Sequence, residues 1–253
     1  MDLGLNGKVA LVTGAGSQKG MGKAIALTLA REGCDIVAAD VDIQGAKKTA
    51  AEVTSLGHKA IAVKADITSS AEVNEMVKTA LAQFGRIDIL VNNAGAISGP
   101  KPFIDSTEAD WDKDININYR GVLNCTKAVL SHMLPRKSGK IINISSIGGR
   151  VGSAHAAVYN GAKAGVIGFT KSLAAGVAGS GINVNSVAPG LVLSNFGGGA
   201  PPPGLLEKAK ETIPSKKITE PQDIANAVAF LASDVSSNIV GQTIGVDGGQ
   251  CMA

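Results

Sequence analysis

Thr13-Gly14-Ala15-Gly16-Ser17-Gln18-Lys19-Gly20-Met21-Gly22 lies between an apolar run over residues 8–13 and a helical pattern over residues 21–32. Glycines at such a turn let the backbone approach a pyrophosphate, and the next helix offers free N–H groups and a positive dipole end. An ordinary glycine-rich turn is the alternative, because such clusters are common. The position between the first strand and the first helix favours dinucleotide binding, through Gly14, Ser17, Gly20, Met21 and Gly22.

Outward from this turn, short β-rich runs alternate with longer helical patterns along the chain. The expected strands cover residues 8–13, 35–40, 60–66, 87–92, 140–145, 183–187 and 243–246, and the expected helices cover 21–32, 43–56, 71–84, 108–134, 157–177 and 221–231. This alternation predicts parallel strands joined by right-handed crossovers. We expect a single-domain α/β Rossmann fold, a doubly wound seven-stranded parallel sheet with helices on both faces. Residues 1–100 would mainly bind the dinucleotide, and residues 101–253 would carry catalysis and substrate.

Composition supports one large aliphatic core. Of the 253 residues, 45% are hydrophobic and only 3% are aromatic, as expected for a parallel sheet packed by helices. The net charge of +3 is mild and gives no electrostatic case for nucleic acid.

Cysteine usage and hydropathy indicate a cytoplasmic protein. Cys34, Cys125 and Cys251 are far apart, odd in number and without metal-ligand spacing, so we expect reduced thiols. The first residues do not resemble a signal peptide, and no apolar run reaches the roughly 20 residues of a membrane span. We therefore expect no membrane partner.

The second expected strand ends at Asp40. A carboxylate there can accept hydrogen bonds from the adenosine ribose hydroxyls and repel a 2′-phosphate, which favours NAD over NADP. The alternative is a solvated aspartate at a strand end. Lys19 acts in the opposite sense, because a basic residue near the glycines can attract a 2′-phosphate. NAD is expected, and NADP stays open.

Several further motifs occur in order. Asp66-Ile67 closes the third expected strand, Asn92-Asn93-Ala94-Gly95 ends the fourth, and Pro189-Gly190 precedes Val192 and Ser194. With the glycine turn, they resemble the short-chain dehydrogenase/reductase family over essentially the whole chain. The turn has two extra residues, placed near Gln18-Lys19. The resemblance implies that Asp66 and Ile67 contact adenine, that Asn93, Ala94 and Gly95 line the cofactor cleft, and that the segment with Pro189, Gly190, Val192 and Ser194 holds the nicotinamide carboxamide.

The resemblance also assigns catalytic residues one at a time. Tyr159-Asn160-Gly161-Ala162-Lys163 matches the family's Tyr-x3-Lys. Ser146, thirteen positions before Tyr159, is preferred to Ser145 as the catalytic serine. Asn118 is preferred to Asn116 because the small Gly121 follows it. No metal is expected.

These residue types suit proton transfer beside a hydride transfer. Tyr159 and Lys163, four residues apart, share one helix face. A free phenol has a pKa of about 10, and Lys163 with the oxidised nicotinamide is expected to lower it. Tyr159 would then exchange a proton with the substrate oxygen, which Ser146 orients. The resemblance adds that Lys163 contacts the nicotinamide ribose and that Asn118 holds a water relay to Lys163.

Two segments are expected to face the substrate, residues 147–158 and residues 191–213. The second contains Gly197–Gly199 and Pro201–Pro203 and is interpreted as a lid, with a passive surface loop as the alternative. Gly148, His155 and Phe196 are candidate substrate contacts beside Ser146. Arg150 is also considered, although a surface position is the simpler expectation for Arg150 and His155.

A small secondary alcohol or ketone is the expected substrate. An NADP(H)-dependent 3-oxoacyl reductase is the alternative, disfavoured by Asp40 and by Ser131 and Ala175 at positions where carrier-docking members place basic residues. Divergent enoyl reductases space their Tyr and Lys more widely. A protein that binds NAD without turnover stays open, but Ser146, Tyr159 and Lys163 are all present. Family members commonly pair the helices expected over 108–134 and 157–177, which predicts a homotetramer.

Overall fold

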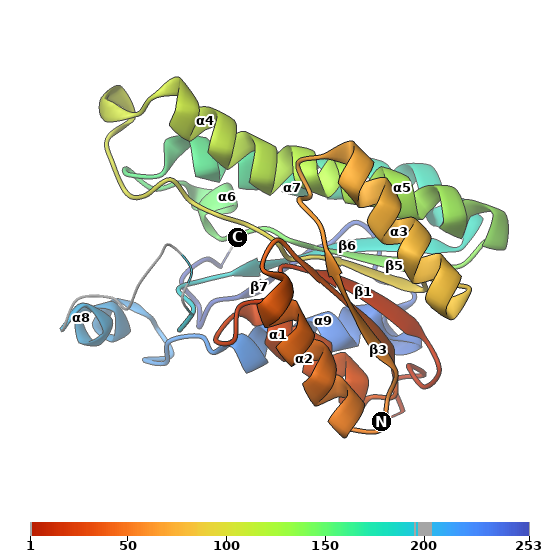
Figure 1. Ribbon diagram of the computed structural model, residues 1–253. Helices are drawn as coiled ribbons and strands as arrows, with labels where there is room; N and C mark the ends of the chain where they lie inside the picture. Colours follow the sequence, from red (N-terminus) through yellow and green to blue (C-terminus); the bar gives the residue numbers. More distant parts are fainter. Residues whose placement is uncertain (1, 195, 197–203, 253) are drawn as a thin grey trace.

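The computed structural model describes residues 2–194, 196 and 204–252. Seven parallel strands within them form one sheet in the order β3-β2-β1-β4-β5-β6-β7 (Figure 1). The strands are β1 (Val9–Thr13), β2 (Asp35–Asp40), β3 (Ala60–Lys64), β4 (Ile89–Asn92), β5 (Gly139–Ile144), β6 (Ile182–Pro189) and β7 (Thr243–Val246). The chain order reverses between β1 and β4, which creates a crevice at the carboxyl ends of these strands.

Helices cover both faces of the sheet. One face carries α1 (Met21–Arg31), α2 (Ile43–Ser55) and α9 (Pro221–Ala232), and the other carries α3 (Ser70–Phe84), α5 (Gly121–Arg136) and α7 (Ala157–Val177) (Figure 1). The sequence sets helix starts locally: the Asp42 side chain accepts from Gln44 N and Gly45 N at α2, and Ser69 Oγ accepts from Glu72 N at α3. The predicted doubly wound fold is confirmed.

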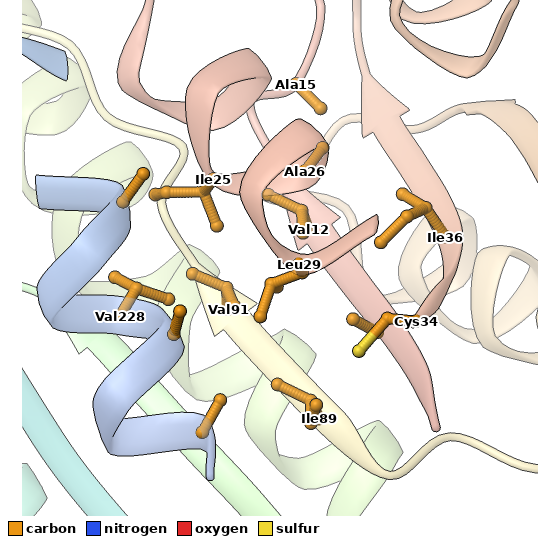
Figure 2. Close-up of a cluster of buried hydrophobic side chains, with 14 of the residues drawn as sticks. Val12, Ala15, Ile25, Ala26, Leu29, Cys34, Ile36, Ile89, Val91 and Val228 are labelled. Carbon is orange, nitrogen blue, oxygen red and sulfur yellow. The ribbon is translucent and has the colours of Figure 1, made fainter. Parts of the chain in front are cut away.

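Two aliphatic layers hold the sheet between the helices. In Figure 2, Ile25 and Leu29 of α1 and Val228 of α9 pack on Val12 of β1 and Val91 of β4. The opposite layer contains side chains of α3, α5 and α7. The low aromatic content therefore fits the core that forms.

The helix expected over residues 108–134 forms and contains one π-helical turn. α4 (Glu108–Ile115) is followed by the π-helical segment η2 (Asn116–Arg120) and then by α5. Within it, the Asn118 side chain donates from Nδ2 to the backbone oxygen of Asp114 at 2.9 Å, which takes up a carbonyl of the helix ladder. The helix predicted over residues 108–134 is present, and hydrophobic periodicity did not register its one widened turn.

Residues 191–213 also contain a helix that the composition did not predict, α8 (Leu205–Thr212). The Gly/Pro-rich composition of residues 195–204 concealed it. Residues 195 and 197–203, which carry the expected hinge and spacer, lie outside the described residues. The remaining short elements are α6 (Gly148–Val151) and the 3₁₀ segments η1 (Phe103–Asp105), η3 (Ala178–Ser180) and η4 (Asp234–Ser236).

The three cysteines are buried and unbridged. Burial raises the pKa of both the Cys34 and the Cys125 thiol to about 12, so these thiols are unreactive near neutral pH. Across residues 2–194, 196 and 204–252, we find no helix that combines the length and the apolar character a membrane crossing needs.

Candidate active site and cofactor cleft

Two adjoining pockets open at the carboxyl edge of the sheet. The larger one has a volume of about 480 Å³ and the smaller one about 190 Å³. Both are lined by Met21, Asn93, Gly95, Ser194 and Phe196, so they form one continuous cleft. We call them the dinucleotide pocket and the catalytic pocket. A further cavity of about 280 Å³ lies at the opposite edge of the sheet, and none of the predicted site residues lines it.

The glycine turn forms one wall of the dinucleotide pocket. Gly14, Ser17, Gly20, Met21 and Gly22, the residues predicted to bind the dinucleotide, all line it. Gly20 is the N-cap of α1 and caps it with no side chain, so the first N–H groups of the helix are free to meet a ligand. A Cβ on Gly22 would lie 2.1 Å from Gly14 O, which leaves no room for any other residue there. This cradle fits the pyrophosphate of a dinucleotide.

Asp40 lines the dinucleotide pocket at the end of β2. Its Oδ2 accepts from Gly16 N at 2.7 Å and its Oδ1 accepts from Asp42 N at 2.9 Å. Each carboxylate oxygen can accept a further bond, so Asp40 both fixes the glycine turn and can meet ribose hydroxyls. Lys19, by contrast, is exposed and does not line the pocket.

The inserted Gln18 has a role that sequence reasoning missed. Its Nε2 donates to Gly16 O at 2.9 Å and to Gly45 O at 3.0 Å, while Lys23 Nζ donates to its Oε1 at 3.0 Å. The lengthened turn is therefore held against α2. Only the presence of an insertion with an amide side chain hinted at this from the sequence.

The other predicted dinucleotide residues, Asp66, Ile67, Asn93, Ala94 and Gly95, line the same pocket. Asn93 Nδ2 donates to Thr13 O at 2.9 Å and ties β4 to the glycine turn, whereas its buried Oδ1 has no partner among the described residues. A Cβ on Gly121 would lie 2.4 Å from Ile67 Cδ1, so the small residue after Asn118 makes room for Ile67. The unsatisfied Oδ1 and the glycine cradle fit a bound dinucleotide.

Ser146, Tyr159 and Lys163 meet in the catalytic pocket, with Pro189, Gly190, Val192 and Ser194 on its far side. Ser146 Oγ accepts from Gly148 N at 3.1 Å, so its hydroxyl hydrogen can donate into the pocket, on the side of Tyr159. Lys163 Nζ donates to Ile144 O at 2.9 Å and lies 5.8 Å from the centroid of the Tyr159 ring. A donor, an acid/base group and a cation thus surround one small space.

Burial controls the protonation of this site. It raises the pKa of Tyr159 to about 12, against a hydrogen bond with Ser146 that lowers it, and the charge of Asp114 raises it further. Burial also lowers the pKa of Lys163 to about 8. The expected lowering of the Tyr159 pKa by Lys163 is therefore not a property of the protein alone, because desolvation of the phenolate outweighs a cation that is itself desolvated.

Asn118 is fully buried and lies behind the pocket rather than in its lining. Its Nδ2 donates to Ala96 O at 2.6 Å and its Oδ1 accepts from Ala96 N at 3.3 Å, so it fixes the chain just after Gly95. A Cβ on Gly95 would contact both Asn118 Oδ1 and Lys163 Nζ, at 3.0 and 3.5 Å. Asn118 and Lys163 therefore both lie close to Gly95.

The candidate substrate contacts lie in different parts of the structure. Phe196 lines the catalytic pocket, and its ring centroid lies 5.9 Å from that of Tyr159. His155 is exposed and lines a separate small cavity, where its backbone oxygen accepts from Lys101 N at 2.9 Å. Gly148 contributes its N–H to Ser146 rather than a wall of the pocket. Arg150 Nη2 donates to Thr243 O in β7, which gives Arg150 a structural contact.

A buried polar ladder beneath the catalytic pocket was also missed. Asn92 Nδ2 donates to Asn143 Oδ1 at 2.8 Å, Asn143 Nδ2 donates to Thr170 Oγ1 at 2.9 Å, and Thr170 Oγ1 donates to Val166 O at 2.8 Å. The ladder links β4, β5 and α7, the element that carries Tyr159 and Lys163. Asparagines inside expected strands were the available signal.

No cluster of three or more metal-ligating side chains occurs within the described part of the chain. The polar side chains of the cleft carry hydroxyl, phenol, amide, ammonium and carboxylate groups, which fits an organic cofactor with phosphates and hydroxyls.

Comparisons with known proteins agree with this geometry. Residues 14–250 match the family model described as enoyl-(acyl carrier protein) reductase. The chain is 44% identical over 249 residues to a 3-oxoacyl-[acyl-carrier-protein] reductase of Staphylococcus epidermidis, covering 97% of this chain and 99% of that relative. It is 41% identical over 254 residues to (2S)-[(R)-hydroxy(phenyl)methyl]succinyl-CoA dehydrogenase subunit BbsD of Thauera aromatica, covering 99% of each.

Solved structures give the same result. A putative short-chain alcohol dehydrogenase from Sinorhizobium meliloti 1021 superimposes with a TM-score of 0.93 at 32% identity, covering 99% of this chain and 98% of that one. Levodione reductase superimposes with a TM-score of 0.89 at 33% identity, covering 97% and 98%.

Proposed function

This chain belongs to the short-chain dehydrogenase/reductase family, as a nicotinamide-dependent oxidoreductase of CH–OH and carbonyl groups, and from that premise we propose its substrate class and residue roles. It transfers a hydride between NAD(H) and a small secondary alcohol or ketone, with Tyr159 as general acid and base. The observation that carries this is the meeting of Ser146, Tyr159 and Lys163 in a pocket continuous with the dinucleotide pocket.

Each residue has a distinct task. The Ser146 hydroxyl donates to the substrate oxygen and holds it beside the phenol, and Tyr159 gives or takes the proton. Lys163 supplies positive charge near the phenolate and, with Asn118 behind it, shapes the floor of the pocket. The nicotinamide, when bound, supplies the hydride chemistry.

Tyr159→Phe tests this assignment directly. The substitution removes the proton donor while keeping the ring, so we expect turnover to fall by about 10²–10⁴-fold. NADH affinity, measured by fluorescence titration, should change little. Retained turnover would refute the role of Tyr159, and a parallel loss of NADH binding would point to a structural defect instead.

NAD(H) is the proposed cofactor because Asp40 lines the dinucleotide pocket at the end of β2 and Lys19 does not line it. Wild type should bind NADH much more tightly than NADPH in fluorescence titrations. Asp40→Asn keeps an acceptor for Gly16 N but removes the negative charge. It should therefore reduce the difference in affinity between NADH and NADPH. Tight NADPH binding by the wild type would overturn the assignment.

A second candidate, reduction of a 3-oxoacyl thioester, is favoured by the names of the relatives. One is a 3-oxoacyl-[acyl-carrier-protein] reductase, and another is a (2S)-[(R)-hydroxy(phenyl)methyl]succinyl-CoA dehydrogenase subunit. A 3-oxoacyl-CoA and a free ketone of equal chain length separate the two candidates. If kcat/KM is at least tenfold higher for the thioester than for the free ketone, the thioester becomes the proposed substrate.

The remaining proposals concern organisation. Residues 1–100 mainly bind the dinucleotide, residues 101–253 carry catalysis, and residues 191–213 form the lid, of which α8 is the described helix. We also propose a homotetramer, because family members commonly pair the corresponding helices. We propose a cytoplasmic location, which the buried, unbridged cysteines support.

A further inference from the structure

Gln18 is an exposed residue of the lengthened glycine turn, yet its amide group is engaged on both sides. Its Nε2 donates to Gly16 O at 2.9 Å and to Gly45 O at 3.0 Å, and Lys23 Nζ donates to its Oε1 at 3.0 Å. The two amide hydrogens can thus serve the two carbonyls, while the amide oxygen accepts from the ammonium group. Carbonyls only accept and an ammonium group only donates, so the reversed amide would satisfy none of these partners.

Gly16 connects Gln18 with Asp40. Asp40 Oδ2 accepts from Gly16 N at 2.7 Å, and a Cβ on Gly16 would lie 2.7 Å from Asp40 Cγ. The two polar groups of Gly16 are therefore held by different side chains, the N–H by Asp40 and the carbonyl by Gln18. A shift of Gly16 would move the N–H that fixes the Asp40 carboxylate.

A second path joins the same two side chains through the start of α2. Asp42 N donates to Asp40 Oδ1 at 2.9 Å, and Asp42 Oδ1 accepts from Gly45 N at 3.0 Å. The hydrogen bonds thus close a ring, which we call the Asp40 ring and which consists of Asp40, Gly16, Gln18, Gly45 and Asp42. A Cβ on Gly45 would lie 2.2 Å from Gly16 O, so the two backbone segments of the ring are in close contact.

The Asp40 ring restricts the carboxylate that is expected to meet the adenosine ribose. Both oxygens of Asp40 accept from backbone N–H groups, so the carboxylate presents one orientation to the dinucleotide pocket. A free carboxylate could turn away from a 2′-phosphate, and it would lose conformational freedom on bonding ribose hydroxyls. A carboxylate that is held in place therefore discriminates more strongly between the two cofactors.

We propose that Gln18 is a positioning residue for cofactor selection, which acts through Gly16 to hold Asp40 in the orientation that favours NAD(H) over NADP(H). This inference rests on the proposed function, in which Asp40 selects the cofactor. Lys23 supports the arrangement, because it bonds the Gln18 oxygen and pairs with Glu52 of α2 at 2.6 Å. Neither Gln18 nor Lys23 lines the dinucleotide pocket, so both act on the cofactor through other residues.

The ratio of the NADPH and NADH dissociation constants tests the proposal without turnover. The two cofactors share the pyrophosphate, so general damage to the glycine turn weakens both and leaves the ratio unchanged. Gln18→Ala should instead lower the ratio in fluorescence titrations by roughly two- to tenfold, the range that corresponds to one hydrogen bond. If the ratio equals that of the wild type, the proposal is wrong, whether or not both affinities fall.

A double-mutant cycle with Asp40→Asn shows whether Gln18 acts through Asp40. In the Asp40→Asn background, Gln18→Ala should leave the ratio unchanged, because the charge that Gln18 positions is gone. An effect of equal size in both backgrounds would mean that Gln18 acts by another route, for instance through Lys19, and would overturn the proposal.

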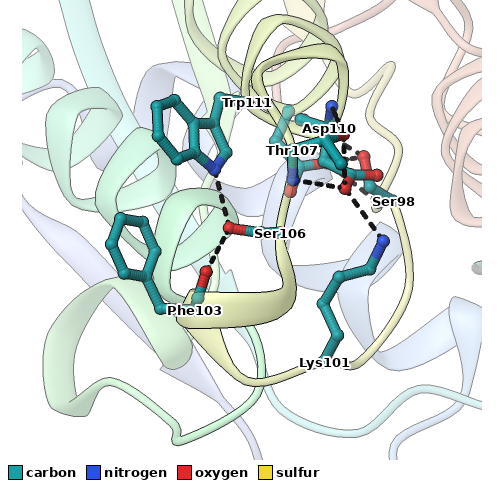
Figure 3. Close-up of polar contacts among 8 residues, drawn as sticks. Ser98, Lys101, Phe103, Ser106, Thr107, Asp110 and Trp111 are labelled. Carbon is teal, nitrogen blue, oxygen red and sulfur yellow. Dashed lines mark hydrogen bonds and ion pairs between the residues drawn. The ribbon is translucent and has the colours of Figure 1, made fainter.

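Matched variants separate hydrogen bonding from packing and from general loosening of loops. Gln18→Met keeps the length of the side chain and should lower the ratio as Gln18→Ala does. Gln44→Ala removes another exposed glutamine, for whose side chain no hydrogen bond is found in the described structure. Ser106→Ala loosens a different loop, in which Ser106 Oγ donates to Phe103 O at 2.6 Å and accepts from Trp111 Nε1 at 2.7 Å (Figure 3).

Neither Gln44→Ala nor Ser106→Ala should change the ratio. A wild-type ratio in Gln18→Met, or a lowered ratio in either control, would contradict the proposal. The wild-type titration separates this inference from the proposed function. A wild type that prefers NADPH overturns the cofactor assignment and this inference together. A wild type that prefers NADH, with the same ratio in Gln18→Ala, overturns the inference alone.

Discussion

Lys163 is 3% exposed and donates to Ile144 O, and no acidic side chain pairs with it in the described parts of the chain. Burying an ammonium group in this way disfavours its charged form. The residue is therefore held at a cost to stability, which is expected of a group whose placement serves binding and catalysis rather than folding.

The cost of burying Lys163 predicts a pH-dependent stability. Its pKa falls from 10.5 in the unfolded chain to about 8 in the protein, so between these values the unfolded state binds more protons. Stability then rises with pH through this window, by up to about 3 kcal/mol. Urea unfolding of wild type and Lys163→Met near pH 7 and above pH 10 isolates this contribution, since other groups cancel in the difference.

The free energy of unfolding of the wild type should rise relative to that of Lys163→Met as the pH rises. A difference that stays constant, or that moves in favour of the methionine variant, would mean that the ammonium group keeps its hydration in the folded protein.

At the scale of elements, the start of α1 is built around contacts that exclude any side chain. A Cβ on Gly22 would meet Gly14 O at 2.1 Å and Asn93 Nδ2 at 2.6 Å. The backbone of the turn and the Asn93 side chain, just after β4, thus both lie against the start of the helix. In the proposed function, glycine there would let the free N–H groups of α1 approach the pyrophosphate.

Gly22→Ala should therefore disturb the turn. We expect a loss of about 1–3 kcal/mol in the free energy of unfolding, by analogy with overpacked cores, and NADH binding at least tenfold weaker. Gly168→Ala is the matched control, because a Cβ at Gly168 of α7 meets nothing within 4 Å. It should leave NADH affinity unchanged and stabilise the helix by about 0.5–1 kcal/mol. Equal NADH affinity in both variants would argue against the cradle.

At the junction of α4 and α5, the π-helical segment η2 positions the side chain of Asn118. The Asn118 side chain bonds both Asp114 O and Ala96, and the helix widens into η2 at this residue. One asparagine thereby links the end of β4, the buried Asp114 and the neighbourhood of Lys163. A regular helix would leave the Asp114 carbonyl to the helix ladder.

At the scale of the molecule, the cleft lies where the order of the strands reverses. β1 and β4 are neighbours although their crossovers run to opposite sides, so their carboxyl ends diverge and leave room for a ligand. The dinucleotide pocket contains residues that follow β1, β2, β3 and β4, and the catalytic pocket adds residues after β5 and β6. One edge of the sheet thus gathers residues that are far apart in the chain.

The proposed homotetramer predicts a sedimentation mass of four times the chain mass of 25.5 kDa. Ile115, at the end of α4, is 44% exposed within the helical region expected to form an interface. Ile115→Glu should lower the mass, because it would bury a charge. Ile104→Glu, at an exposed position of η1 outside that region, is the control and should leave the mass unchanged. A monomeric wild type at micromolar concentration would exclude the assembly.

The sequence alone determined the fold and most of the site. Alternating patterns fix a parallel sheet because buried strands and amphipathic helices have different hydrophobic periods. The glycines of residues 14–22 and the spacing of Ser146, Tyr159 and Lys163 mark the two pockets, because the topology leaves few places for strand-end residues to meet.

Only the tertiary structure decided the electrostatics and the local irregularities. The burial that raises the Tyr159 pKa, the exposure of Lys19, the separate cavity of His155 and the placement of Asp114 beside α7 all depend on distances between segments remote in the chain. The π-helical turn within the helix over residues 108–136 and the helix α8 were also found only in the tertiary structure. Periodicity reports which face of an element is buried, whereas desolvation and charge act through the space between elements.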